Sequence, residues 1–257
     1  MITGIINAIK IIFLLGFLVI IHEGGHFLVA KLCKVKVNEF AIGFGKAIWK
    51  KQGKETLYSL RMIPLGGFVQ MEGESEDSED QRAFTNVSIP KRIAIVSAGA
   101  IVNILFGIIV YFLLISTVGI QFVDSSKDTI LNRIYYGGIN TWELILSIFD
   151  SIKMLFTNGV SVEQMTGPVG ISQIVVQATG FANYFYVLAV ISVSLGVTNL
   201  LPIPALDGGK IVLLIIEAIR RKKITLETEA KLTVLGFSLL IALSLYVTYH
   251  DVIRIFQ

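Results

Sequence analysis

The chain contains one short motif, His22-Glu23-Gly24-Gly25-His26, whose residue types and spacing are those of a metal-dependent hydrolase. On a helix of about 3.6 residues per turn, His22 and His26 lie on one face, where both imidazoles can bind the same Zn²⁺. Glu23 is then close enough to accept a proton from a metal-bound water. The motif predicts a zinc site with Glu23 as general base. Two histidines that only pack within a helix are the alternative.

The composition places this motif in a membrane protein. The chain has 257 residues, 54% hydrophobic and 16% charged, and its mean hydropathy is +0.73. Because soluble domains carry about 25% charged residues, we predict an integral membrane protein. A histidine or glutamate at membrane depth indicates a functional site by default. The single cysteine, Cys33, excludes an internal disulfide and a cysteine-built zinc site, and the sequence carries no nucleic-acid signature.

Four segments are long and apolar enough to cross a bilayer, which takes about 20 residues of helix. The predicted transmembrane helices span residues 5–33, 93–120, 184–219 (broken near its proline-containing loop) and 232–249. The first helix has no basic residue before Lys10 and no small-residue cleavage site, so we expect a retained helix rather than a signal peptide. The fold class predicted is an α-helical integral membrane protein, with residues 1–257 forming one domain.

The positions of lysine and arginine predict the orientation of these helices. Residues 31–92 carry 11 of the 22 basic side chains and residues 220–231 carry five, whereas residues 121–183 carry three. The loops after the first and third helices are therefore expected in the cytoplasm, with both termini outside. About 17 residues, or roughly 25 Å of helix, separate Ile5 from His22, so the motif is expected inside the membrane near its cytoplasmic side.

The segments between the helices predict smaller elements. Residues 35–72 alternate in polarity between turn residues, which predicts a small antiparallel β-meander. Because non-helical backbone at membrane depth must be buried or line a wet cavity, we expect a re-entrant region folded back toward the metal. A cytoplasmic hairpin is the alternative. The acidic loop at 72–90 is expected to be solvated, and residues 121–180 to hold a polar connector, up to residue 140, and an interfacial amphipathic helix.

A catalytic zinc needs a third protein ligand beside the two histidines. His250, the remaining histidine, is predicted near the outer end of the last helix, at the wrong depth. Asp207 is the better candidate, because it follows Pro202 and Pro204, which interrupt the third helix near the predicted depth of His22. The two glycines after this aspartate allow close backbone approach. An aspartate that only caps a helix is the alternative.

The chain resembles the site-2 protease family of intramembrane zinc metalloproteases, and more narrowly its bacterial RseP-like branch. The resemblance rests on the first motif together with Asn199-Leu200-Leu201-Pro202-Ile203-Pro204-Ala205-Leu206-Asp207-Gly208-Gly209. It extends to all four predicted membrane helices and to three shorter stretches, namely Gly43-Phe44-Gly45, Pro64-Leu65-Gly66-Gly67-Phe68 and Thr166-Gly167-Pro168-Val169-Gly170.

The resemblance implies that His22, His26 and Asp207 bind zinc, that Glu23 is the catalytic base, and that Asn199 contacts or orients the substrate. It implies further substrate contacts in the re-entrant β-region, at Gly43, Phe44, Gly66, Gly67 and Phe68. The implied reaction is hydrolysis of a peptide bond in the transmembrane segment of a single-span protein. Such substrates are of the anti-sigma-factor or signal-peptide-remnant type, in the lipid bilayer of a bacterial inner membrane.

Two features depart from the family pattern. Members of this branch usually carry one or two PDZ domains between the second and third membrane helices, where this chain has only a short connector. The second helix reads Ala98-Gly99-Ala100 where relatives often have a proline in the third position. Asn103, three residues further on, is expected to form a hydrogen bond between helices.

Two other functions fit parts of the pattern. A membrane metal transporter would use His22, His26 and Asp207 as an ion site, but the second and fourth helices offer few further polar residues for a path. A zinc protease with a cytosolic catalytic domain would need a sizeable soluble domain after the motif, which this sequence lacks.

Overall fold

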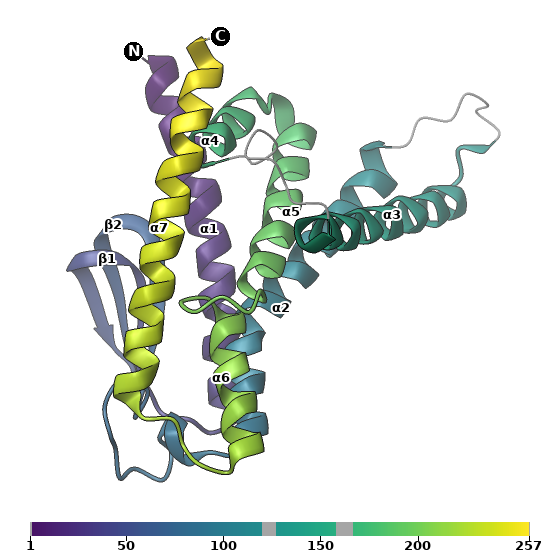
Figure 1. Cartoon of the computed structure of the whole chain (residues 1–257). Helices are drawn as coiled ribbons and strands as arrows, with labels where there is room; N and C mark the ends of the chain where they lie inside the picture. Colours follow the sequence, from purple (N-terminus) through teal and green to yellow (C-terminus); the bar gives the residue numbers. More distant parts are fainter. Residues whose placement is uncertain (1, 120–126, 158–166, 257) are drawn as a thin grey trace. The chain divides into compact units, whose positions relative to one another are not determined.

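The computed structural model describes residues 2–119, 127–157 and 167–256. Residues 121–126 of the predicted connector, and Thr166, lie outside the described residues. The elements are α1 (Ile2–Leu32), β1 (Val37–Gln52), β2 (Leu57–Met71), η1 (Phe84–Asn86), α2 (Ile89–Leu114), the π-helical turn η2 (Ile115–Gly119), α3 (Ile130–Thr157), α4 (Pro168–Gln177), α5 (Gly180–Asn199), α6 (Asp207–Arg220) and α7 (Leu226–Phe256), as Figure 1 shows.

Four of the described helices are long and apolar enough to cross a membrane. They are Gly4–Leu32, Ile89–Gly119, Gly180–Asn199 and Leu226–Ile253. Large apolar side chains such as Phe13, Leu105 and Leu239 lie exposed on them, as expected where the solvent is lipid. The predicted class, a four-helix membrane protein with a small sheet after the first helix, is confirmed.

The sheet is built from two long antiparallel strands (Figure 1). Val37–Ile42 of β1 pairs with Gly67–Met71 of β2, and Ala47–Gln52 pairs with Leu57–Arg61. Gly43 and Gly66, at positive φ, lie where each strand bends. Because both strands bend, Glu39–Ile42 also pairs with Leu57–Leu60. The short antiparallel segments that the sequence predicted as a meander are therefore present, within two long strands.

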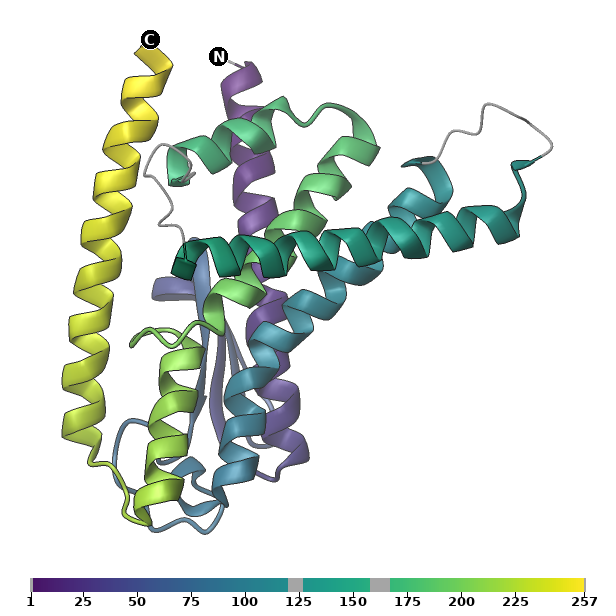
Figure 2. The same cartoon turned by 45° about the vertical axis from the view of Figure 1, so that its right-hand side comes forward.

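The described elements form two compact units, residues 1–104 with 195–240 and residues 105–194 with 241–257. The core of the first unit gathers the ends of α1 and β2 with η1, α2 and α6, through Ala30, Met71, Phe84, Ile95 and Leu214. Figure 2 shows α6 beside the first part of α2. This unit contains every residue of the predicted metal site.

The loop between the strands is tied to the same unit by Glu55. Its carboxylate accepts hydrogen bonds from Lys31 at 2.6 Å and from Arg82 at 2.7 Å. These bonds lower the pKa of Glu55 to about 2. The far turn of the sheet is thereby fastened to the end of α1 and to the segment before α2.

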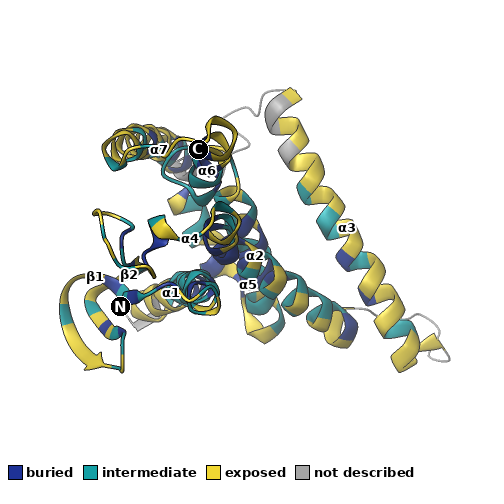
Figure 3. Ribbon diagram, turned by 90° about the horizontal axis from the view of Figure 1, so that it is seen from below, coloured by how far each residue is buried: buried dark blue, intermediate teal, exposed yellow. Residues whose placement is uncertain are grey.

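In the second unit, α3 begins at Ile130, so residues 130–140 are helical where the sequence predicted a connector. Gly137 and Gly138 lower the helix propensity of this segment, because each glycine destabilises a helix interior by about 1 kcal/mol. The sequence therefore did not predict a helix here. Gly137 nevertheless lies in close contact with η2, since a Cβ there would lie 1.9 Å from Ser116 Oγ. Figure 3 shows α3 exposed along most of its length, as an interfacial helix would be.

The buried ion pair between Arg92 of α2 and Glu217 of α6 gives the first prediction. Their side chains are 6% and 8% exposed and 2.7 Å apart, and the guanidinium lies 5.2 Å from the ring of Phe84. Glu217→Ala should lower the free energy of unfolding in detergent by about 3–5 kcal/mol, because it leaves a buried, unpaired cation. The double variant Arg92→Met/Glu217→Leu should lose much less. Equal losses in the two variants would contradict this account.

Candidate metal centre

The two histidines of the motif converge on one point. Both lie on α1, one helical turn apart, and their Nε2 atoms are 3.2 Å apart, with the rings edge to face. The side chains are only 11% and 12% exposed. Two ring nitrogens at this distance present their lone pairs to a shared position, which is the geometry a metal ion requires.

Asp207 supplies the third atom. Its Oδ2 lies 3.2 Å from His22 Nε2 and 3.5 Å from His26 Nε2. Asp207 is the first residue of α6, whereas the cap position is Leu206, so the aspartate does not act as a helix cap. Its Oδ2 is buried and accepts no hydrogen bond of good geometry from the described residues.

These three atoms fit a tetrahedral zinc. With metal–ligand bonds of about 2.1 Å, ligand atoms around such an ion are about 3.4 Å apart, close to the three distances observed. Among the described residues, His22, His26 and Asp207 form the group able to hold a metal ion. They line a cavity of about 210 Å³. The cavity leaves room for a water as fourth ligand.

The Nδ1 atoms of the two imidazoles, which point away from the metal position, also have hydrogen-bond partners. His26 Nδ1 lies 2.8 Å from the carbonyl oxygen of Ile95, which can only accept, so Nδ1 carries the proton and Nε2 is free to bind a metal. His22 Nδ1 lies 3.4 Å from the side-chain amide of Asn103, which is fully buried in α2. The expected hydrogen bond of Asn103 between helices is confirmed.

Glu23 lines the same cavity as the three ligand atoms. The strand β2 passes directly beside it: a Cβ on Gly67 would lie 3.3 Å from Glu23 Cγ and 2.8 Å from the carbonyl oxygen of Ala41. Only glycine at this position lets the backbone of the sheet come so close to the carboxylate. Phe68, the next residue, also lines the cavity.

The other β-region residues lie further along the sheet. The ring of Phe44, 47% exposed, covers Gly66, where a Cβ would lie 2.1 Å from the ring. Gly43 packs on the backbone of Ile63. Of the five β-region residues, Phe68 lines the metal cavity and Gly67 lies beside Glu23, whereas Gly43, Phe44 and Gly66 are at the bend of the sheet.

Asn199 is the last residue of α5, half-buried, directly before the loop that leads to Asp207. Ala205 in this loop has a φ of +81°, a conformation that non-glycine residues rarely adopt. A Cβ on Gly208 would lie 2.2 Å from the carbonyl oxygen of Leu201. The loop therefore folds back tightly on the start of α6, and this packing fixes the position of Asp207.

The role of one glycine escaped the sequence analysis. Gly99 of α2 lies against the ring of His26, so closely that a Cβ there would be 2.4 Å from Nε2. Gly25 packs on the same part of α2, where its Cβ would lie 2.6 Å from the carbonyl oxygen of Ala98. Small residues on two helices at similar depth were the available signal. By contrast, Gly24 has open space beside it.

This fold and this site define a multi-pass membrane metalloprotease of the H-E-x-x-H type. Residues 10–243 match the sequence profile of peptidase family M50, and the chain belongs to that family, which contains the site-2 proteases. The cofactor of the family is zinc.

Several relatives carry the name of zinc metalloproteases. A protein of Clostridium acetobutylicum is 31% identical over 96% of this chain and 97% of its own length. One of Clostridium perfringens is 30% identical over 92% of this chain and 95% of its own, and one of Fusobacterium nucleatum is 27% identical over 95% and 98%. The first alignment spans 332 positions, more than the 257 residues here, so that relative contains residues without a counterpart in this chain.

The contact between Gly99 and His26 gives the second prediction. Gly99→Ala should lower the affinity for zinc by about 10–100-fold, because the added methyl group displaces a ligating ring. Gly24→Ala is a matched control, since it adds the same methyl group to a helix near the site but into open space. Zinc per protein, measured by mass spectrometry after equilibration with a zinc buffer, checks this. Equal zinc contents would show that Gly99 does not hold the ring in place.

Proposed function

We propose that this protein is an intramembrane zinc endopeptidase in which His22, His26 and Asp207 hold the ion and Glu23 is the general base. The observation that carries the proposal is the convergence of three ligand atoms within 3.2–3.5 Å of one another in a cavity that Glu23 also lines. The substrate would be the transmembrane segment of a single-span membrane protein, of anti-sigma-factor or signal-peptide-remnant type.

The roles of the chain's own groups follow from their positions. Zinc bound here would polarise the scissile carbonyl and lower the pKa of a water molecule. The Glu23 carboxylate accepts a proton from that water and later donates it to the nitrogen of the leaving amine. The carbonyl of Ile95 keeps His26 in the tautomer that can bind metal. Asn199 contacts or orients the substrate near the scissile bond.

The substrate helix must unwind before its peptide bonds become accessible, and the sheet offers a partner for the unwound segment. Gly67–Met71 of β2 pairs with β1 on one side, and no strand among the described residues pairs with its other edge. Phe68, Val69 and Met71 from this stretch line the metal cavity. An extended peptide paired with this edge would recover its lost backbone hydrogen bonds close to Glu23.

The distribution of basic residues supports an orientation for the membrane protein. The segments after α1 and after α6 are rich in lysine and arginine, which favours their placement in the cytoplasm of a bacterial cell. Both termini would then lie outside the inner membrane, and the metal site would lie inside it, near the cytoplasmic side. Residues 1–257 would act as one protease domain.

The proposal is tested with purified protein and single-span substrates, with mass spectrometry of the fragments. The wild type should cut within the transmembrane segment and lose activity with a zinc chelator. Glu23→Gln should lower kcat by about 10²–10⁴-fold with zinc content unchanged, because the amide cannot accept the proton. A transporter that used the same three ligands would not need a proton acceptor at position 23. Full proteolytic activity of Glu23→Gln would contradict the role of Glu23 as general base.

Pairing of the substrate with the edge of β2 is tested separately at position 68. Phe68→Pro should reduce turnover at least about tenfold and leave zinc content intact, because proline removes a backbone N–H donor from the strand. Phe68→Leu keeps the N–H and an apolar side chain, and should retain most of the activity. Equal turnover of the two variants would argue against strand pairing.

A further inference from the structure

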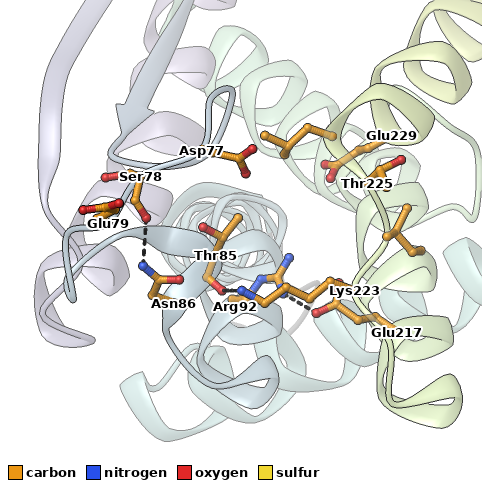
Figure 4. A pocket seen from close by; sticks show the side chains of 12 residues that line it. Asp77, Ser78, Glu79, Thr85, Asn86, Arg92, Glu217, Lys223, Thr225 and Glu229 are labelled. Atoms are coloured by element: carbon orange, nitrogen blue, oxygen red, sulfur yellow. Dashed lines mark hydrogen bonds and ion pairs between the residues drawn. The ribbon is translucent and has the colours of Figure 1, made fainter.

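Three cavities of the first unit follow one another from the metal site. The metal cavity of about 210 Å³ and a second of about 260 Å³ are both lined by Glu74, Asp207 and Lys210. Glu229 lines the second cavity and also a third of about 510 Å³, which is bounded by polar side chains of the segments around residues 77–86 and 223–229 (Figure 4). The shared residues stand at the two boundaries of this series.

The ammonium group of Lys210 forms ion pairs with one carboxylate at each boundary between cavities, Glu74 and Glu229. Lys210 Nζ lies 2.7 Å from Glu74 Oε1 and 3.5 Å from Glu229 Oε1, and 4.9 Å from the ring centre of Phe84. All three charged side chains are 22–23% exposed. Two carboxylates therefore lie close to the ammonium and compensate its charge.

The three charges come from three separate elements. Glu74 follows β2, Lys210 is in α6 one helical turn after Asp207, and Glu229 is in the first turn of α7. Breaking the two ion pairs would let these elements separate at the boundaries between the cavities. Because the three side chains are not fully buried, the pairs can separate when water hydrates the freed charges.

The reaction proposed above, on which this inference rests, makes such a boundary important. Peptide hydrolysis consumes a water molecule and leaves a new carboxylate on one fragment and a new amine on the other. Neither water nor a charged chain end passes easily through lipid. A polar path to the metal cavity is therefore needed, and the path must be narrow enough to limit the water around a membrane-embedded substrate.

We propose that Lys210, paired with Glu74 and Glu229, is the gate of a polar path along which water reaches, and the cut peptide end leaves, the metal cavity. In the closed state the ammonium bridges the two carboxylates. In the open state the pairs separate and the charged groups are hydrated. Lys210 is in this sense a positioning residue that acts through its two partners.

The test measures access to the metal cavity without depending on activity or on bound metal. In a Cys33→Ser background, Val69→Cys places one thiol in the metal cavity, since Val69 lines that cavity and neither of the other two. The protein in lipid nanodiscs is treated with a cationic, water-soluble methanethiosulfonate, and the labelling rate is followed by mass spectrometry. Lys210→Met should label about tenfold faster, because the open state becomes more populated, whereas Lys210→Arg, which keeps the charge, should label at nearly the original rate.

Two controls fix the interpretation. Lys231→Met breaks an exposed ion pair with Glu227, 2.7 Å long, on the same helix as Glu229 and should leave the rate unchanged. Thr225→Cys, at an exposed position in the outer cavity, should label equally in all backgrounds, which shows that the reagent reacts equally with each variant. An unchanged thermal unfolding midpoint shows that the variants are folded. If Lys210→Met does not fold, Glu229→Gln replaces it and should also label faster. Equal labelling of Val69→Cys in all folded variants would overturn the gate, whereas loss of proteolysis alone would bear only on the proposed function.

Discussion

The placement of one carboxylate between two imidazoles is the constraint on which the first unit depends. Asp207 Oδ2 faces both Nε2 atoms at 3.2 and 3.5 Å, and it is buried. A buried carboxylate without good donors is destabilising by several kcal/mol unless a cation compensates it. In a metalloprotease of this family, zinc is that cation. Metal binding and the packing of α1 against the start of α6 are then expected to stabilise each other.

The helices that carry the ligands pack with their backbones close together, and this close packing holds the ligand side chains in position. Gly25 and the segment at Ala98 bring α1 against α2, and Gly208 lets the loop after α5 lie on the first turn of α6. On α7, a Cβ at Gly236 would lie 1.9 Å from the carbonyl oxygen of Pro204. These contacts join four helices through small residues, as is common in membrane proteins, where burial of apolar surface does not drive helix association.

Much of this architecture was predictable from local patterns. The spacing of His22 and His26 requires one helix face, and the hydropathy of four segments requires membrane helices. The place of Asp207 followed from the prolines before it and from the depth of the site. The contacts of Gly99 and Lys210 were not predictable, because they depend on which atoms of a distant element lie beside each residue. The start predicted for α3 was wrong for a related reason: Gly137 disfavours a helix locally, and its close approach to Ser116 exists only in the folded chain.

The lining of the metal cavity is partly apolar and partly charged. A peptidase in a membrane must admit both an apolar peptide segment and water. Part of the cavity lining comes from Gly67–Met71 of β2, whose second edge pairs with no strand in the described part of the chain and whose apolar Phe68 and Val69 match an unwound, apolar peptide. Another part consists of the charged side chains of Glu74 and Lys210, which match water and ionised chain ends. Glu23 stands beside the backbone of Gly67 and lines the same cavity as Lys210. In the proposed mechanism, the apolar part of this lining would take the substrate and the charged part would admit water, so the two reactants would not need to share a path through lipid.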